Sequence, residues 1–248
     1  MNEPEKPKKG WAWQIWLAVL VVIGLLFYLA MPNHGRVHRG TYQYKGINNA
    51  RQIIGLIHVY AADYGTYPDH GLDHSNLTSN RAFRPLFSEG LIMDESIFGC
   101  PGSMYAPDKD IGTATEYDQA LTAGENHWVL VAGMNTDSPA HYPLLMENAV
   151  DATWPPRWLP YVPNKPMKGL AWYDDTIIVG FNDGSVQKVK LVERDGFLHL
   201  PKSILEPKGK TPLPVMKILD IIPRGSGPYV NPPGSAPGPP LNAPAGRQ

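Results

Sequence analysis

The chain has 248 residues, which is room for one large domain or two small ones. Lysine and arginine number 22 and aspartate and glutamate 23, so the formal net charge is -1. This balance argues against nucleic acid as a partner, because neutralising phosphates requires a basic excess. Hydrophobic residues make up 43% of the chain, which is enough for a packed core and excludes wholesale disorder.

The first predicted element is a transmembrane helix over residues 11–31. This stretch carries no charged residue, and as a helix it would span about 31 Å, close to the ~30 Å of a bilayer core. Trp and Tyr residues lie near both of its ends, where amphipathic rings favour the membrane interface. The alternative is a cleaved signal peptide, but the apolar run is longer than such peptides use and no small-x-small cleavage site follows it.

Basic residues flank this segment almost equally, with three lysines before it and three basic residues soon after it. The short tail of residues 1–10 is easily retained in the cytoplasm. We therefore expect a single-pass inner (cytoplasmic) membrane protein whose bulk is extracytoplasmic or periplasmic, with the lipid bilayer as its first partner.

An amphipathic helix is predicted over residues 47–64, because apolar residues recur there at alternating spacings of three and four. Gly65 supplies a natural end, and Pro68 prevents the helix from resuming. A second, shorter helix is predicted over residues 81–89. A helix with one wide apolar face requires a sheet or another helix to cover it.

Strands follow in the second half of the chain. Short apolar or alternating runs bounded by turn residues predict strands at 127–134, 142–148, 176–181 and 185–192. The turn Asn182-Asp183-Gly184 predicts a hairpin between the last two, since these residues tolerate the positive φ of tight turns. The fold class expected is therefore α+β, with the amphipathic helix packed on an antiparallel sheet.

From residue 201 onward the pattern fades into a tail rich in Pro and Gly. Half of residues 223–248 (13 of 26) are Pro or Gly, a composition that buries too little apolar surface to offset its ordering entropy. Residues 215–222 could still add a last strand or a helical turn. The expected organisation is a short tail (1–10), a transmembrane helix (11–31), an extracytoplasmic domain (32–200) and an extended tail (201–248).

The order of these segments, together with three short motifs, resembles a known family. The motifs are Tyr64-Gly65-Thr66-Tyr67-Pro68 at the end of the helix, Cys100-Pro101, and a hairpin with Phe181, Asp183, Gly184 and Val186. Over about residues 11–192 the chain resembles the type IV pilin-like proteins. It is most similar to the type II secretion pseudopilins of the divergent planctomycete and verrucomicrobia type.

This resemblance implies a pilin-like fold and a structural or assembly function. The protein would be a membrane-anchored subunit of a type II secretion or type IV pilus-like apparatus, and its partners would be other pilin-like subunits or copies of itself. An enzyme is not expected, because the sequence carries no nucleophile elbow, phosphate loop or His-Glu zinc helix.

The chain departs from the family pattern at its start. Pilin precursors are cut after a Gly and carry a Glu five residues later, whereas here Gly10 is followed by Trp11 and Ile15 stands at the Glu position. That Glu neutralises the amine of a neighbouring subunit during assembly. We therefore expect this chain to keep its N-terminus. Many relatives also carry a His at the position of Tyr173.

An aromatic segment offers a candidate site for a partner. Its residues are Trp154, Trp158, Tyr161 and Trp172, and neighbouring prolines hold the first part extended. These rings could form a platform for a glycan or a protein, or they could pack against the sheet. The first option supports an alternative function, an anchored extracytoplasmic binding protein that recognises its partner through this Trp/Pro-rich segment.

Two loops carry groups that could hold a metal, although no metal or other cofactor is required by the sequence. Some pseudopilins bind calcium, and the loop oxygens suited to it here belong to Asp108, Asp110, Glu116 and Asp118. The run 69–74 places two His and two Asp close together, as a zinc site could, but Gly71 favours a solvated loop.

Cys100 is the only cysteine, so we expect no intramolecular disulfide and no cysteine-based zinc site. It could be a reactive thiol. Since no neighbouring His or cation is identifiable from the sequence, we expect a small buried side chain instead.

Overall fold

A computed structural model describes residues 11–30, 34–206 and 216–225. Within these ranges, it describes the backbone alone for residues 11–12, 29–30 and 34–39. The chain divides into two units, Met1–Thr41 and Tyr42–Gln248. The expected short tail over residues 1–10 lies outside the described residues, as do residues 207–215 and 226–248 of the expected C-terminal tail.

Helix α1 (Trp11–Ala30) forms within the segment expected to span the membrane. Among the residues that the structure describes, no helix combines the length and the apolarity needed to cross a membrane. The side chains described in α1, those of residues 13–28, are all exposed. The transmembrane span therefore stays a prediction.

Helix α2 (His34–Tyr64) is longer than the helix expected over residues 47–64. Its end agrees with the prediction: Gly65 adopts a φ of 74°, and its N–H donates to the Ala61 carbonyl at 2.8 Å. Its start was predicted too late, because residues 34–46 contain little apolar periodicity and the helix there gives no amphipathic signal.

A five-stranded antiparallel sheet forms the centre of the second unit, in the order β5-β4-β2-β1-β8. Its strands are β1 (Trp128–Ala132), β2 (Pro143–Glu147), β4 (Thr176–Phe181), β5 (Val186–Lys190) and β8 (Lys217–Leu219). Every residue of β1, β2 and β4 is buried, so both faces of these strands are covered. The α+β class with an antiparallel sheet and helices is confirmed.

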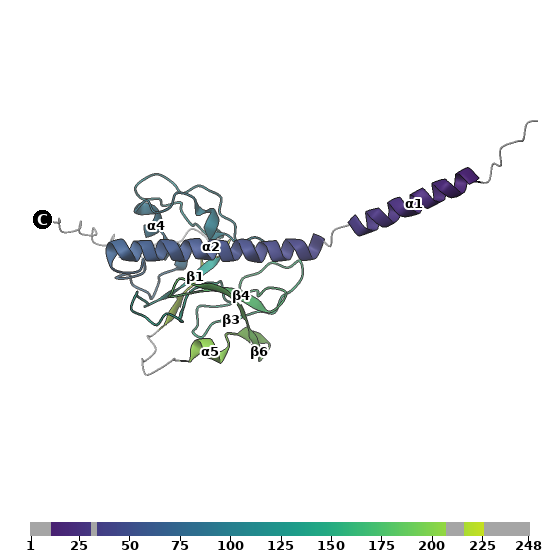
Figure 1. Cartoon of the computed structure of the whole chain (residues 1–248). Coiled ribbons are helices and arrows are strands. Elements are labelled where there is room, and N and C mark those ends of the chain that lie inside the picture. Colours follow the sequence, from purple (N-terminus) through teal and green to yellow (C-terminus); the bar gives the residue numbers. More distant parts are fainter. Residues whose placement is uncertain (1–10, 31–33, 207–215, 226–248) are drawn as a thin grey trace, which may run out of the picture. The chain divides into compact units, whose positions relative to one another are not determined.

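Helix α2 lies along one face of this sheet (Figure 1). Its buried stripe includes Ala50, Ile53 and Ile57. Two glycines permit the close approach. A Cβ on Gly180 of β4 would collide with Ile54 Cδ1, and a Cβ on Gly46 of α2 would lie 2.6 Å from Ile178 Cδ1. A larger residue at either position would therefore require the facing isoleucine side chain to shift.

A second, three-stranded sheet has the order β3-β7-β6 and consists of β3 (Arg157–Trp158), β7 (Phe197–His199) and β6 (Val192–Arg194). The strand expected over residues 185–192 is thus divided between two sheets: β5 ends at Lys190, and β6 begins at Val192. Leu191, between them, is buried, and its N–H donates to Asp175 O at 2.9 Å.

Short helices cover the sheet beside α2: α3 (Ser79–Phe83), α4 (Pro85–Ser88) and the 3-10 helix η1 (Glu95–Phe98). The short helix expected over residues 81–89 is therefore present as two helices, α3 and α4, separated at Arg84. Pro85 has no N–H to continue the α3 ladder and instead occupies the start of α4. Burial of Phe83 against Phe98, with ring centroids 5.1 Å apart, joins these helices to the core.

The segment expected as a tail contains ordered elements. Helix α5 (Lys202–Leu205) follows β7, and β8 pairs with β1 so that Leu219 lies opposite Leu130. Both leucines are fully buried. The prediction of a further strand within residues 215–222 is confirmed, and residues 216–222 belong to the folded domain and not to an extended tail.

Candidate functional site

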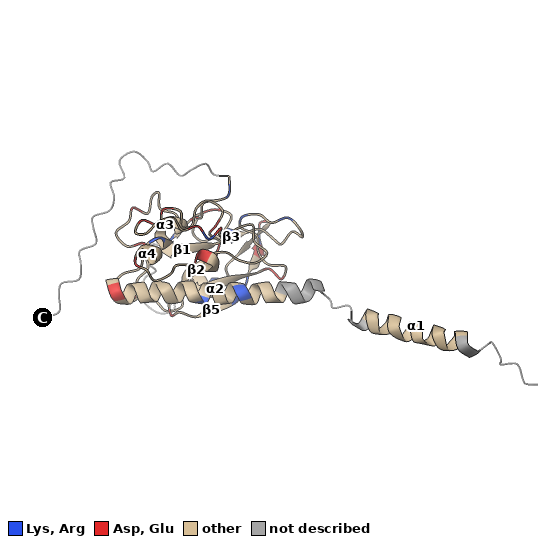
Figure 2. Ribbon diagram, turned by 90° about the horizontal axis from the view of Figure 1, so that it is seen from above, with Lys and Arg blue, Asp and Glu red and all other residues tan. Residues whose placement is uncertain are grey.

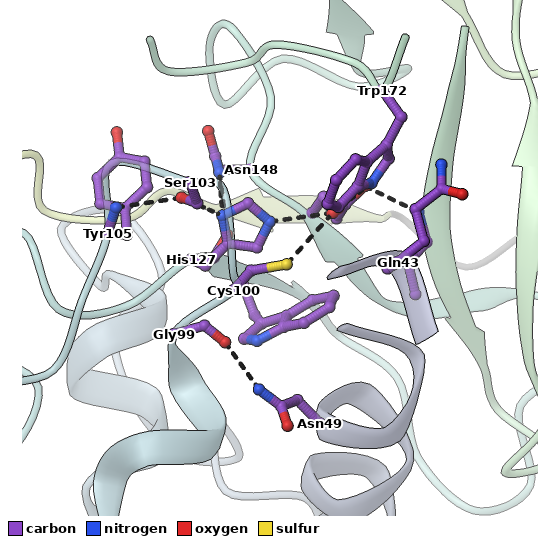
Figure 3. Close-up of polar contacts among 12 residues, drawn as sticks. Gln43, Asn49, Gly99, Cys100, Ser103, Tyr105, His127, Asn148 and Trp172 are labelled. Atoms are coloured by element: carbon purple, nitrogen blue, oxygen red, sulfur yellow. Dashed lines mark hydrogen bonds and ion pairs between the residues drawn. The ribbon is translucent and has the colours of Figure 1, made fainter. Parts of the chain in front are cut away.

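Three buried side chains of different chemistry meet close to Gly46 of α2: Cys100, His127 and Glu147. Figure 3 shows Cys100 and His127 side by side. Cys100 follows η1, His127 immediately precedes β1, and Glu147 is the last residue of β2. One potential ligand atom from each, a sulfur, a nitrogen and an oxygen, lies within 4.8 Å of the other two. This cluster is the strongest candidate for a functional site among the described residues.

The sheet register brings His127 and Glu147 together. Trp128 pairs with Glu147 across β1 and β2, and the Asn148 N–H donates to the His127 carbonyl at 3.0 Å. Leu145 lies opposite Gly180, the residue of β4 that faces Ile54 of α2. Leu145 and Glu147 are two residues apart on β2, so their side chains point to the same face of the sheet. Glu147 therefore points toward α2 and meets Cys100 there.

The Glu147 carboxylate accepts hydrogen bonds from several donors. His127 Nε2 lies 3.1 Å from Oε1, and the Ile178 N–H donates to Oε2 at 2.9 Å. The indole N–H of Trp172 reaches both oxygens, at 2.9 and 2.8 Å, and the Cys100 thiol donates to Oε1 at 3.9 Å. These donors stabilise a negative charge on a side chain that is almost fully buried.

The hydrogen-bond partner of the second ring nitrogen, Nδ1, identifies the tautomer of His127. Asn148 Oδ1 accepts from the Gly169 N–H at 2.7 Å, which fixes the amide and places its Nδ2 3.0 Å from His127 Nδ1. An amide N–H is a donor, so Nδ1 acts as the acceptor. His127 is then a neutral imidazole whose Nε2–H donates to Glu147.

Burial, followed by the charge and the hydrogen bond of Glu147, raises the pKa of the Cys100 thiol well above its ordinary value. A thiol in this state is not a nucleophile, since the reactive species is the thiolate. Cys100 is buried, as expected, but its surroundings are polar. Its His neighbour was not evident from the sequence, because His127 lies 27 positions further along the chain.

A cavity of about 70 Å³ adjoins the cluster. His127 and Glu147 form part of its polar side, while Tyr161, Leu170 and Trp172 contribute apolar or aromatic walls. This space can admit a few water molecules or a small chemical group next to His127 and Glu147.

The aromatic residues predicted to bind a partner do not share one exposed surface. Trp158 is fully buried in β3, and Trp154 packs half-buried against the core. Tyr161 and Trp172 both line the cavity, and Trp172 is fixed there by its hydrogen bonds to Glu147. Two of the four candidates are thus brought to the cluster.

The acidic loop predicted to suit calcium contributes one residue to a second cluster. Asp108 has a carboxylate oxygen within 4.8 Å of oxygens of Glu95 and Glu125, two buried residues that the sequence did not single out. Burial raises the pKa of both glutamates. The other predicted ligands, Asp110, Glu116 and Asp118, are exposed and do not join this group.

The run 69–74 forms neither of the two clusters found among the described residues. His74 Nε2 lies 3.2 Å from Asp69 Oδ2, whereas His70 is exposed. Asp69 is buried and accepts from the Gly133 N–H at 3.1 Å. In the described structure this run is a loop held by Asp69.

A larger and more open cavity of about 580 Å³ lies along the edge strand β5. Lys188 and Lys190 line it from β5, and Ser203 and Ile204 line it from α5. Lys188 Nζ is already paired with Asp174, at 2.8 Å.

Comparison with known proteins adds no assignment: no protein family, no curated protein and no solved structure matches this chain at a significant level.

Proposed function

We propose that the protein is a pseudopilin-like structural subunit of a type II secretion or type IV pilus-like apparatus, anchored in the inner membrane by residues 11–31 and exposing its folded domain to the periplasm. The observation that carries the proposal is the packing of the 31-residue helix α2 on an antiparallel sheet, through Gly46 and Gly180, directly after an apolar helix in the sequence. A long helix laid on such a sheet is the arrangement that the family resemblance implies.

The composition of α1 supports the anchor. Its sequence has no charged residue, and its aromatic residues lie toward its ends. Apolar side chains exposed along a whole helix require a lipid or protein environment. The absence of the family's Glu supports retention of the N-terminus.

The outward face of α2 supports assembly with other subunits. Tyr44 is 72% exposed and Val59 47% exposed on this helix. From residue 40 to its end, α2 carries only three charged residues, Lys45, Arg51 and Asp63, so long parts of it are uncharged (Figure 2). A helix face with few charges and large exposed apolar groups suits contact with a neighbouring subunit.

The anchor is tested on the full-length chain expressed in a bacterium with two membranes. We expect it to remain in the membrane pellet after alkaline extraction, to require detergent for release, and to have an intact mass that includes Met1. A chain that begins at Trp11 would instead indicate maturation of the pilin type. Release into the soluble fraction without detergent would contradict anchoring.

Assembly can be tested by cysteine cross-linking, because the only natural cysteine, Cys100, is buried. Single cysteines are placed at exposed positions: Gln52→Cys on α2 and Gln187→Cys on the sheet edge β5, with Glu116→Cys in an exposed loop as the matched control. In membranes, mild oxidation should give cross-linked multimers from at least one of the first two variants and fewer from the control. Monomers at every position would refute the structural proposal.

The second candidate function, an anchored binding protein, is favoured by the cavity that Tyr161 and Trp172 line. It predicts that the monomeric protein is retained by a glycan or protein ligand, and that Tyr161→Ala abolishes retention. Tyr161 is the better variant to test, since Trp172 also holds Glu147 in place. Retention by a monomer that never cross-links would favour this candidate over the first.

A further inference from the structure

We propose that Cys100, His127 and Glu147 bind a zinc ion whose fourth coordination position opens into the adjoining cavity. Thiolate sulfur, imidazole nitrogen and carboxylate oxygen are the three ligand types that zinc takes in proteins. Three protein ligands with one open position is also the usual composition of a zinc site that holds water or a small ligand. Nothing in the proposed structural function requires such a site.

The distances between the ligand atoms are close to those of a tetrahedral zinc centre. Zinc bonds of about 2.0–2.3 Å place tetrahedral ligands roughly 3.3–3.7 Å apart. Here Nε2 of His127 and Oε1 of Glu147 are 3.1 Å apart, and Sγ of Cys100 is 3.9 Å from the same oxygen. The third separation, from Cys100 Sγ to a ring nitrogen of His127, is within 4.8 Å, so side-chain rotations that shorten it would complete the ligand set.

Two protons occupy the place between these ligands in the metal-free protein, one on Nε2 of His127 and one on the sulfur of Cys100. When zinc binds, the thiol proton is released to solvent and the Zn–S bond forms. The imidazole stays neutral: the Nε2 proton leaves, and Nδ1 takes up a proton. The two charges of the ion then balance the thiolate and the Glu147 carboxylate, so no net charge remains buried.

The groups around the cluster support this ligation. Ser103 Oγ lies 2.9 Å from His127 Nδ1 and can accept its proton, while the Tyr105 N–H donates to the same Oγ at 3.1 Å. Asn148 Nδ2 would give up its bond to Nδ1 once Nδ1 carries a proton, and would keep its bond to the His127 carbonyl, 3.1 Å away. On the other side, the Ile178 N–H holds Glu147 Oε2. The Trp172 indole N–H, shared between both oxygens, would keep its bond to Oε2 when Oε1 binds the metal. Such outer contacts orient zinc ligands and strengthen binding.

The choice of zinc follows from the ligand set. Calcium and magnesium prefer ligand sets made of oxygen atoms alone. The sulfur and nitrogen ligands of this site therefore exclude both ions as its natural metal. Copper would also accept these ligands, and it is distinguished from zinc by direct metal analysis. The remaining alternative is a network joined only by protons, in which the cluster stabilises the fold without a metal.

The test uses the full-length chain, purified in detergent without a polyhistidine tag and equilibrated with buffered zinc. We expect one zinc per chain, and at least about a tenfold weaker affinity in Cys100→Ala and in His127→Gln, since even outer contacts are worth ten- to hundredfold. His70→Gln, the same change at an exposed His outside the cluster, is the matched control and should bind as the natural protein does.

Cobalt substitution identifies the ligands without relying on the stability of a variant. Cobalt bound by the natural chain should show a thiolate-to-metal charge-transfer band and a tetrahedral visible spectrum. Ser103→Ala should weaken binding about ten- to hundredfold and preserve that band. If the natural chain binds no more zinc than Cys100→Ala, or binds cobalt without the thiolate band, the site is a proton-bonded network and the proposal is wrong.

Discussion

His127 Nε2 lies 3.1 Å from Glu147 Oε1. The contact joins the residue immediately before β1 to the last residue of β2, whose register partner is Trp128. The sheet in turn is held at a fixed distance from α2 by glycine contacts. The integrity of the cluster therefore depends on the packing of α2 on β4.

The first prediction concerns that packing. Gly180→Ala introduces a Cβ that collides with Ile54 Cδ1, so we expect a loss of about 1–3 kcal/mol in the free energy of unfolding. Gly55→Ala is the matched control: it lies on the exposed side of α2 with nothing within 4 Å of the new Cβ, and should gain about 0.5–1 kcal/mol. Urea denaturation of both variants measures the two changes. Equal effects would show that α2 does not lie closely on β4.

Most of the large elements of the fold were predictable from local patterns. The runs that became β1, β2 and β4 are short, apolar and bounded by turn residues, and the end of α2 is marked by Gly65. The errors have local causes as well. The start of α2 lacks apolar periodicity, and Pro85 divides one expected helix into two. Strand β8 lies near a Pro- and Gly-rich stretch, so its short apolar run gave only a weak signal.

The candidate site was less predictable, because its residues come from distant parts of the sequence. An antiparallel pairing of the two expected strands about their common turn places His127 opposite Asn148. Strand alternation would then turn the His127 side chain away from Glu147, so the contact depends on the irregular backbone before β1 and was not predictable from the strand pattern. The position of Cys100 was not predictable either, since it depends on how η1 packs under α2. The burial of Trp158 likewise depends on a second sheet that the sequence did not reveal.

The second prediction separates the two roles considered for the aromatic segment. Trp158 is fully buried, so Trp158→Ala should lower the free energy of unfolding by about 3–5 kcal/mol. Trp154 is only half-buried, and Trp154→Ala should cost less. Thermal unfolding of both variants provides the comparison. A Trp158→Ala protein of unchanged stability but lost ligand retention would restore Trp158 as a binding residue.

The third prediction is a pH dependence at Asp69. Burial raises the pKa of this carboxyl in the folded protein, so it holds its proton to a higher pH than in the unfolded chain, where the pKa is about 3.9. The folded state then binds more protons, and the free energy of unfolding falls as the pH rises from about 3.9 through the raised pKa. Asp69→Asn keeps an acceptor for the Gly133 N–H and should remove this fall.

Asp73 provides the control with the opposite sign. Its side-chain and backbone hydrogen bonds from Ser75 lower its pKa, so its contribution to stability is lost as the pH falls through that lowered value. Urea denaturation across the acidic range, for Asp69→Asn and Asp73→Asn, should show opposite changes in slope. If Asp69→Asn leaves the slope unchanged, the carboxyl of Asp69 titrates as it does in the unfolded chain.

The last prediction places the end of the folded domain. Leu219 is fully buried and pairs with Leu130 on strand β1, so Leu219→Ala should cost about 2–5 kcal/mol in the free energy of unfolding. Ending the chain at Gly225 leaves β8 in place, together with the carbonyls of Asp220 and Ile222, which accept from the N–H groups of Ser79 and Gly124. Because residues 226–248 are rich in Pro and Gly, that truncation should cost less than about 1 kcal/mol. Urea denaturation of the two chains tests both values. A large loss on truncation would show that residues 226–248 are docked on the domain or on a neighbouring subunit, and cross-linking of the truncated chain would then decide between the two.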